Sequence, residues 1–72
     1  MCQATVYLVH GDGESEEIMR DTTRLSIVDG GVQVETFFEN PVVVPARVAS
    51  IDFLKNTVTL TPMSSAQKRG AA

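Results

Sequence analysis

Short runs of alternating apolar and polar residues, each closed by glycine, asparagine or proline, constrain the fold of this chain more than any other feature. In the clearest runs, at 4–9, 32–37, 47–53 and 57–61, apolar side chains recur at every second position. This period is typical of β-strands, and the three- to four-residue spacing of an amphipathic helix is absent. We therefore expect an all-β chain of six to seven short strands.

Turn signals divide these runs into hairpins. Glycine occurs in 10–13 and in 29–31, where a tight reversal needs a positive φ, and 54–56 supplies a third turn. The stretch 16–19 is compatible with a helix, but its length favours a short strand that pairs back onto the first. A clearer strand is expected at 22–28.

Prolines mark where regular structure stops. Asn40-Pro41 is expected to break the strand before it, and Pro45 to close a short apolar strand at 42–44. Because proline cannot donate a ladder hydrogen bond, we expect this last strand at a sheet edge. Residues 63–72 are mostly small and polar and predict a flexible, disordered C-terminal tail.

The size of the chain limits how it can be stabilised. Its 72 residues allow one domain, expected at 1–62, and a domain of this size buries only roughly 60% of the surface of its unfolded form. The single cysteine excludes a disulfide within the chain, which leaves a metal ion or a partner chain as the usual supports. We expect a small, strongly bent antiparallel sheet or an SH3-like barrel.

Charge and hydropathy exclude several classes of protein. The net charge of −3 argues against a sequence-independent grip on nucleic acid phosphates, so nucleic acid is not an expected partner. No apolar run approaches the ~20 residues that cross a bilayer, and the N-terminus lacks the pattern of a secretory signal. We expect a cytoplasmic protein, whose lone thiol stays reduced.

The chain offers few groups for catalysis. His10 is the only histidine, and no serine stands in the context of a nucleophile elbow. Gly11-Asp12-Gly13 leads into acidic residues rather than into the helix that a phosphate-binding loop needs. We therefore expect no enzyme activity. His10 could bind a metal, but with no second ligand nearby in the sequence, a solvated turn residue is the favoured interpretation.

An acidic run and an aromatic pair are the other candidates for a binding surface. The acidic run could bind a hard cation or dock a partner, but a solvated hairpin is favoured because the spacing of a calcium-binding loop is missing. Its members are Glu14, Glu16, Glu17 and Asp21. Phe37 and Phe38 are adjacent, so on a strand they would point to opposite faces. One is expected in the core and the other at a partner or dimer contact.

Cys2 follows the initiator methionine directly. A lone cysteine is most often a small buried hydrophobe, and the spacing alone favours that interpretation. A small residue at position two normally permits removal of Met1, however, and the free amine of Cys2 would then join its thiolate and the amide of Gln3 as donors. Such nitrogen and sulfur donors suit Ni(II), Cu(I) or Zn(II), and two chains at a two-fold axis would supply two thiolates.

Several segments together resemble a known family. They are the Met1-Cys2-Gln3-Ala4 start that opens into a strand, the Asp12-Gly13 turn, the run from Val32 to Phe38, and the run from Ala46 to Phe53. On these residues the chain resembles the CooT family, small nickel-binding proteins of carbon monoxide dehydrogenase maturation. The likeness covers about residues 1–62, and its most specific element is the Met-Cys start.

The resemblance implies a nickel-binding homodimer. One Ni(II) would lie at the dimer interface with Cys2 of each chain as its ligand, and the protein would be a metallochaperone or nickel store for a nickel enzyme such as carbon monoxide dehydrogenase. Backbone nitrogens near Cys2 are implied as further donors, and His10 is not. The alternative is a metal-free β-barrel interaction module that binds a protein or single-stranded RNA through an exposed edge or an exposed phenylalanine.

Overall fold

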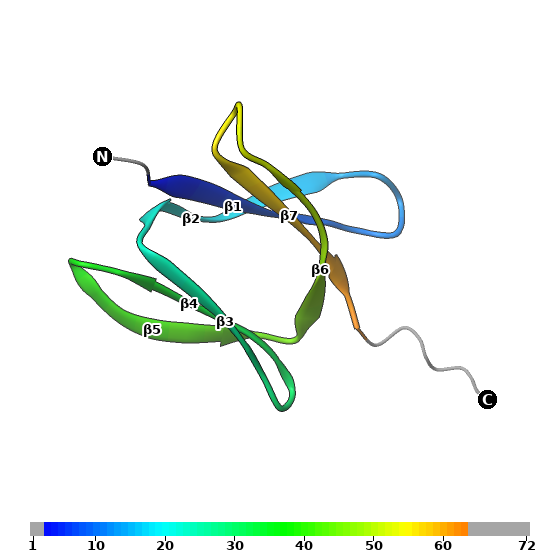
Figure 1. Ribbon diagram of the computed structural model, residues 1–72. Helices are drawn as coiled ribbons and strands as arrows, with labels where there is room; N and C mark the ends of the chain where they lie inside the picture. Colours follow the sequence, from blue (N-terminus) through cyan, green and yellow to red (C-terminus); the bar gives the residue numbers. More distant parts are fainter. Residues whose placement is uncertain (1–2, 64–72) are drawn as a thin grey trace.

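The computed structural model of the protein describes residues 3–63, which form seven β-strands and no helix (Figure 1). The strands are β1 (Ala4–Val9), β2 (Ser15–Thr22), β3 (Arg24–Val28), β4 (Gly31–Thr36), β5 (Glu39–Val44), β6 (Ala46–Asp52) and β7 (Thr57–Pro62). The prediction of an all-β chain with six to seven short strands is confirmed. The ambiguous stretch 16–19 lies inside β2 and is a strand.

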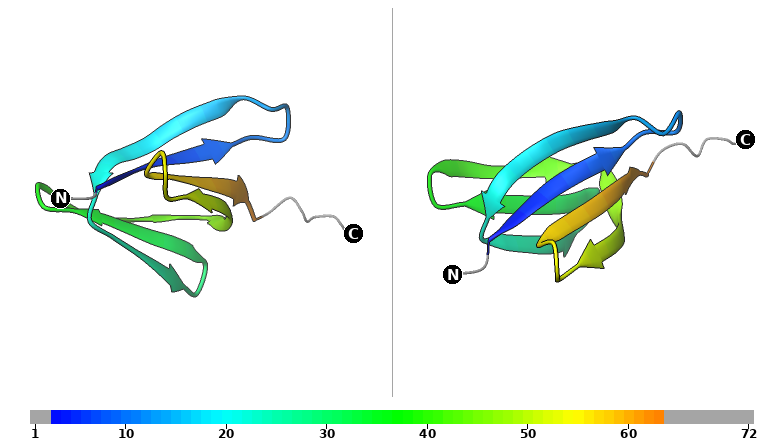
Figure 2. Two further views of the ribbon diagram at one scale, coloured as in Figure 1. Left: turned by 45° about the horizontal axis from the view of Figure 1, so that its top comes forward. Right: turned by 90° about the horizontal axis from the view of Figure 1, so that it is seen from above.

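The strands form two sheets that face each other, and they do not close into a complete barrel (Figure 2). One sheet has the order β2-β1-β7-β6 and the other has the order β3-β4-β5. The first strand, β1, and the last, β7, are therefore the two central strands of the same sheet. There β1 and β7 run parallel, with Val6 beside Val58 and Leu8 beside Leu60, whereas the other paired strands are antiparallel.

The core lies between the inner faces of the two sheets. Its largest fully buried side chains come from three strands: Val6, Val32, Val34 and Leu60. Because side chains alternate between the faces of a strand, the period-two pattern places Val32 and Val34 on the same face. The alternation noted at 57–61 places Val58 and Leu60 on one face of β7, and this face points inward, with exposures of 7% and 0%.

A sharp corner replaces part of the single strand expected at 22–28. β2 ends at Thr22 and β3 begins at Arg24, so the chain passes from one sheet to the other at Thr23. Before the corner, Asp21 takes a positive φ of 58°, and the pairing of β1 with β2 shifts register. A β-bulge of this kind bends a strand, and it redirects the chain into the second sheet.

The second correction concerns the hairpin formed by β4 and β5. Asn40-Pro41 lies within β5 and does not break the chain; the reversal occurs at Phe37-Phe38. β5 is an edge strand with a register shift opposite these residues, so Pro41 is tolerated there and the expected edge position of 42–44 is confirmed. Neither phenylalanine is in the core: both are exposed, because they occupy a turn and not a strand.

The described residues contain no helix that is long and apolar enough to cross a membrane. Of the tail predicted at 63–72, only Met63 is described, and its N–H donates to the Pro45 carbonyl over 3.2 Å. Residues 64–72 lie outside the described residues, so the flexible tail and the domain boundary at 62 stay predictions.

Gly31 is the glycine that the fold requires most strictly. Its φ is +150°, and a Cβ at this position would collide with the carbonyl oxygen of Val44 on the neighbouring strand. We expect Gly31→Ala to lower the free energy of unfolding by more than about 1 kcal/mol in urea denaturation. Gly11→Ala is the matched control, because nothing lies within 4 Å of that position. Equal stability of the two variants would contradict this account.

Candidate functional site

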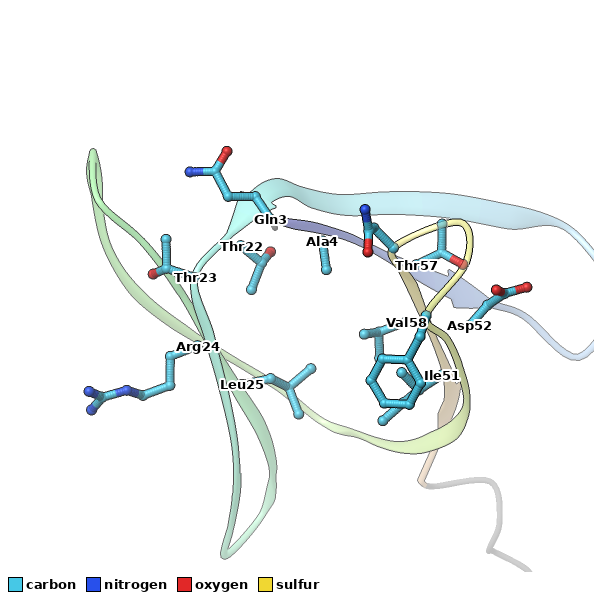
Figure 3. Close-up of a pocket in the computed structure, with 12 residues that line it drawn as sticks. Gln3, Ala4, Thr22, Thr23, Arg24, Leu25, Ile51, Asp52, Thr57 and Val58 are labelled. Atoms are coloured by element: carbon cyan, nitrogen blue, oxygen red, sulfur yellow. The ribbon is translucent and has the colours of Figure 1, made fainter. Parts of the chain in front are cut away.

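The predicted metal ligand Cys2 lies outside the described residues. Its bonded neighbour Gln3 is described and lines a pocket of about 310 Å³ (Figure 3). The pocket lies between the start of β1, the corner from β2 to β3, and the hairpin of β6 and β7. Its lining residues are Gln3, Ala4, Thr22, Thr23, Arg24, Leu25, Ile51, Asp52, Phe53, Asn56, Thr57 and Val58.

The pocket is apolar inside and polar at its rim. Leu25 points into it from β3, facing Val58 and Ile51 from the opposite wall (Figure 3). Arg24 and Gln3 point away from it. It exists because β3 is an edge strand with no hydrogen-bonded partner in the sheet of β6 and β7, so the two inner faces separate on this side. The pocket is therefore an opening into the apolar layer between the sheets.

Large apolar side chains stand exposed beside this opening. Phe53 is 84% and Leu54 98% exposed in the turn between β6 and β7, and Ile51 is half-exposed on β6. The alternation at 47–53 predicts a strand that includes Phe53, but the strand ends one residue earlier. Sequence reasoning missed this apolar group because the gap between the sheets depends on residues that are distant in the sequence.

Hydrogen bonds fix the turn that holds these side chains. Oδ1 of Asp52 accepts the N–H groups of Leu54 and Lys55 over 3.0 and 3.1 Å. Asn56 takes a positive φ of 55°, and its carbonyl accepts the N–H of Thr5 over 2.9 Å. This last bond ties the turn to the first residues of β1, close to the point where Cys2 joins the chain.

His10 lies at the far end of β1, away from the pocket. Its Nε2 is 2.9 Å from Oε1 of Glu16, and its side chain is 43% exposed. In the hairpin turn, the His10 carbonyl accepts the N–H of Gly13 over 2.8 Å. Within residues 3–63, no three His, Cys, Asp or Glu side chains come together as metal ligands. The arrangement agrees with a solvated turn residue.

The acidic run lies along an exposed hairpin and does not form one cluster. Glu14, Glu16, Glu17 and Asp21 are all exposed. Glu17 accepts two hydrogen bonds of 3.0 Å from Arg20. These hydrogen bonds hold the pKa of the Glu17 carboxyl below its usual value, and they raise the pKa of Arg20. The run agrees with the solvated hairpin favoured from the sequence.

Comparison with known proteins gives two findings. The family model described as CO dehydrogenase accessory protein CooT matches residues 1–61. The crystal structure of a candidate CooT protein from Carboxydothermus hydrogenoformans superposes with a TM-score of 0.77 at 21% sequence identity, covering 88% of this chain and 100% of that one. At this identity the structural likeness shows a shared fold. No curated protein matches the chain.

Asn56 provides a test of how the turn supports the start of β1. A β-branched residue is strained at a positive φ, so Asn56→Val should lower the free energy of unfolding by about 1–2 kcal/mol. We also expect faster hydrogen exchange of the Thr5 amide, which bonds to the Asn56 carbonyl. Asn56→Gly, which relieves the backbone, is the control. Unchanged Thr5 exchange in the valine variant would show that the turn does not hold β1.

Proposed function

The chain belongs to the CooT family of CO dehydrogenase accessory proteins, and on this premise we propose that it is a homodimer that binds Ni(II) as cargo through Cys2 of both chains. The family supports a role in enzyme maturation. The observation that carries the finer proposal is the combination of a single thiol per chain with an apolar opening at Gln3, the residue bonded to that thiol.

The donor set near Cys2 fits Ni(II). A thiolate is a soft ligand, and backbone nitrogen completes the mixed nitrogen and sulfur set that favours a square-planar ion. One chain contains one cysteine. A site with two thiolates therefore requires two chains, and the same cysteine from each chain can meet only near a two-fold axis.

This symmetry indicates which surface forms the dimer contact. If the two Cys2 residues lie near the axis, the surface around Gln3 lies near it too, because the two residues are bonded. That surface includes the pocket and the exposed side chains of Ile51, Phe53 and Leu54. Covering them with a second copy would bury apolar area that one small domain cannot bury by itself.

In this proposal the protein holds and transfers an ion and does not catalyse a reaction. The recipient is a nickel enzyme such as carbon monoxide dehydrogenase, and the location is the cytoplasm, where the thiols stay reduced. Nickel bound to the folded dimer would also stabilise it by mass action. A metallochaperone and a nickel store differ only in whether the recipient receives the ion directly.

Cys2→Ser tests the metal site. Titration of the reduced, metal-free protein with Ni(II) should give thiolate-to-nickel charge-transfer absorption that saturates at one ion for two chains. The bands and the metal-bound dimer in native mass spectra should be missing in the variant, because a serine hydroxyl is a poor ligand for this ion. Native mass spectrometry also reports whether Met1 is retained.

The outcome separates the two functions considered from the sequence. A variant that keeps its circular dichroism spectrum but loses nickel supports Cys2 as the ligand. Tight nickel binding by the variant would reject Cys2. No binding by the unaltered protein would favour the metal-free interaction module.

Phe53→Ser tests the dimer surface. We expect the dissociation constant of the metal-free dimer, measured by analytical ultracentrifugation, to rise at least about tenfold, because a large exposed aromatic side chain is a common anchor of interfaces. Phe37→Ser is the matched control: it removes another largely exposed ring, from a different turn. A dimer weakened only by the control would place the contact at the β4–β5 turn instead of the β6–β7 turn.

A further inference from the structure

The turn between β4 and β5 carries two aromatic side chains that the fold does not use. Phe37 is 71% and Phe38 81% exposed. Their rings meet edge to face with centroids 6.3 Å apart, so each ring covers little more than an edge of the other. Two large apolar side chains exposed next to each other make this turn a candidate contact surface.

Turn geometry does not explain the aromatic pair. Thr36 pairs with Glu39, so the loop consists of Phe37 and Phe38 alone. Two-residue hairpin loops favour asparagine and glycine, which accept a positive φ, and neither phenylalanine has one. Core packing does not explain the pair either. Both rings are exposed, and the hairpin contributes Val34 to the interior instead. A position that satisfies neither packing nor turn chemistry is where a functional residue is expected.

An acidic cleft lies next to the pair. Phe38 and Glu39 line a cleft of about 270 Å³ together with the second half of β2. Three carboxylates and one guanidinium line it, and the guanidinium of Arg20 is already held by Glu17 through two hydrogen bonds of 3.0 Å. Asp21 and Glu39 have no ion pair within residues 3–63. Arg20 is also within electrostatic reach of Asp21, but three carboxylates against one guanidinium leave the cleft with a net negative charge beside an aromatic ring.

We propose that the β4–β5 turn docks a segment of a partner protein in which arginine or lysine alternates with an apolar residue. A cation can stack on the face of an exposed ring and pair with the carboxylate of Asp21 or Glu39 at the same time. The apolar side chain of the segment packs on Phe37. Charge complementarity selects this occupant, because an acidic segment would be repelled from the same cleft.

The docking surface goes beyond the proposed function, since it requires neither nickel nor a dimer. Its position relates the docking surface to the surface around Gln3. The β4–β5 turn lies at the same end of the molecule as the start of β1 (Figures 1 and 2). A segment docked at the turn brings its protein to the end of the molecule that carries Gln3.

A peptide titration tests the docking surface without knowledge of the partner. The probe is a capped peptide of sequence Gly-Arg-Leu-Arg-Leu-Gly, added to the isotope-labelled full chain and followed by two-dimensional amide NMR. We expect shift changes confined to 17–21 and 35–40. The peptide Gly-Glu-Leu-Glu-Leu-Gly should cause none, and added salt should weaken the effect because part of the attraction is between charges.

Aromatic variants measure the contribution of the rings. The double variant Phe37→Ser/Phe38→Ser should raise the dissociation constant of the arginine peptide about tenfold. Phe53→Ser, which removes an exposed ring from the β6–β7 turn, should leave it unchanged. This control also separates the present proposal from the proposed dimer surface, since Phe53→Ser should weaken the dimer and the double variant should not.

A charge reversal tests the acidic cleft independently, and it keeps the test valid if the double variant fails to fold. Glu39→Lys should weaken binding of the arginine peptide at least fivefold and should give detectable binding of the glutamate peptide. Equal binding of both peptides, shift changes elsewhere, or no change with the charge reversal would overturn the proposal. Loss of the dimer in the double variant would also overturn it, because a second copy would then be the occupant.

Discussion

The parallel pairing of β1 with β7 is the interaction on which the rest of this structure depends. It places the first strand of the chain beside the last and makes both central in the four-stranded sheet. Val6 and Leu60, which pack on the second sheet, belong to these two strands and are fully buried. The bond from Thr5 to the Asn56 carbonyl extends the same pairing to the start of β1. The start of β1, to which Cys2 is bonded through Gln3, is therefore tied to the sheet that supplies Val6 and Leu60 to the core.

Small size explains why one side of the molecule stays open. The interior is built mainly from valine. Leu25 and Ile51, which line the pocket, are not fully covered: Leu25 is only partly buried against the core, and Ile51 is half-exposed. A chain of this length buries a smaller share of its surface than a larger domain does. A second copy over the opening would complete what one chain leaves incomplete, and it would bring two thiols together. In the proposed dimer, one contact between the two chains would therefore both add stability and create the metal site.

All three phenylalanines of the chain stand in hairpin turns and not in the core. They divide between two surfaces with different surroundings. Phe53 adjoins the apolar pocket near Gln3, whereas Phe38 adjoins a cleft that carries Asp21 and Glu39. An apolar neighbourhood suits a second copy of the chain, and an acidic one suits a basic partner segment. In the proposed function the protein would receive an ion at one surface and meet its client at the other, which would give each surface a separate role.

The sequence by itself determined the strand content, the shared apolar face of Val32 and Val34, the inward positions of Val58 and Leu60, and the family, because alternation and short motifs are local properties. Of the strand predicted at 22–28, only 24–28 belongs to β3, and the predictions of a break at Asn40-Pro41 and of a buried phenylalanine were wrong. The bulge at Asp21, the edge position of Pro41 and the turn at Phe37-Phe38 depend on which strands pair. Only the tertiary structure decided them, together with the pocket, because pairing is set by contacts between residues far apart in the chain.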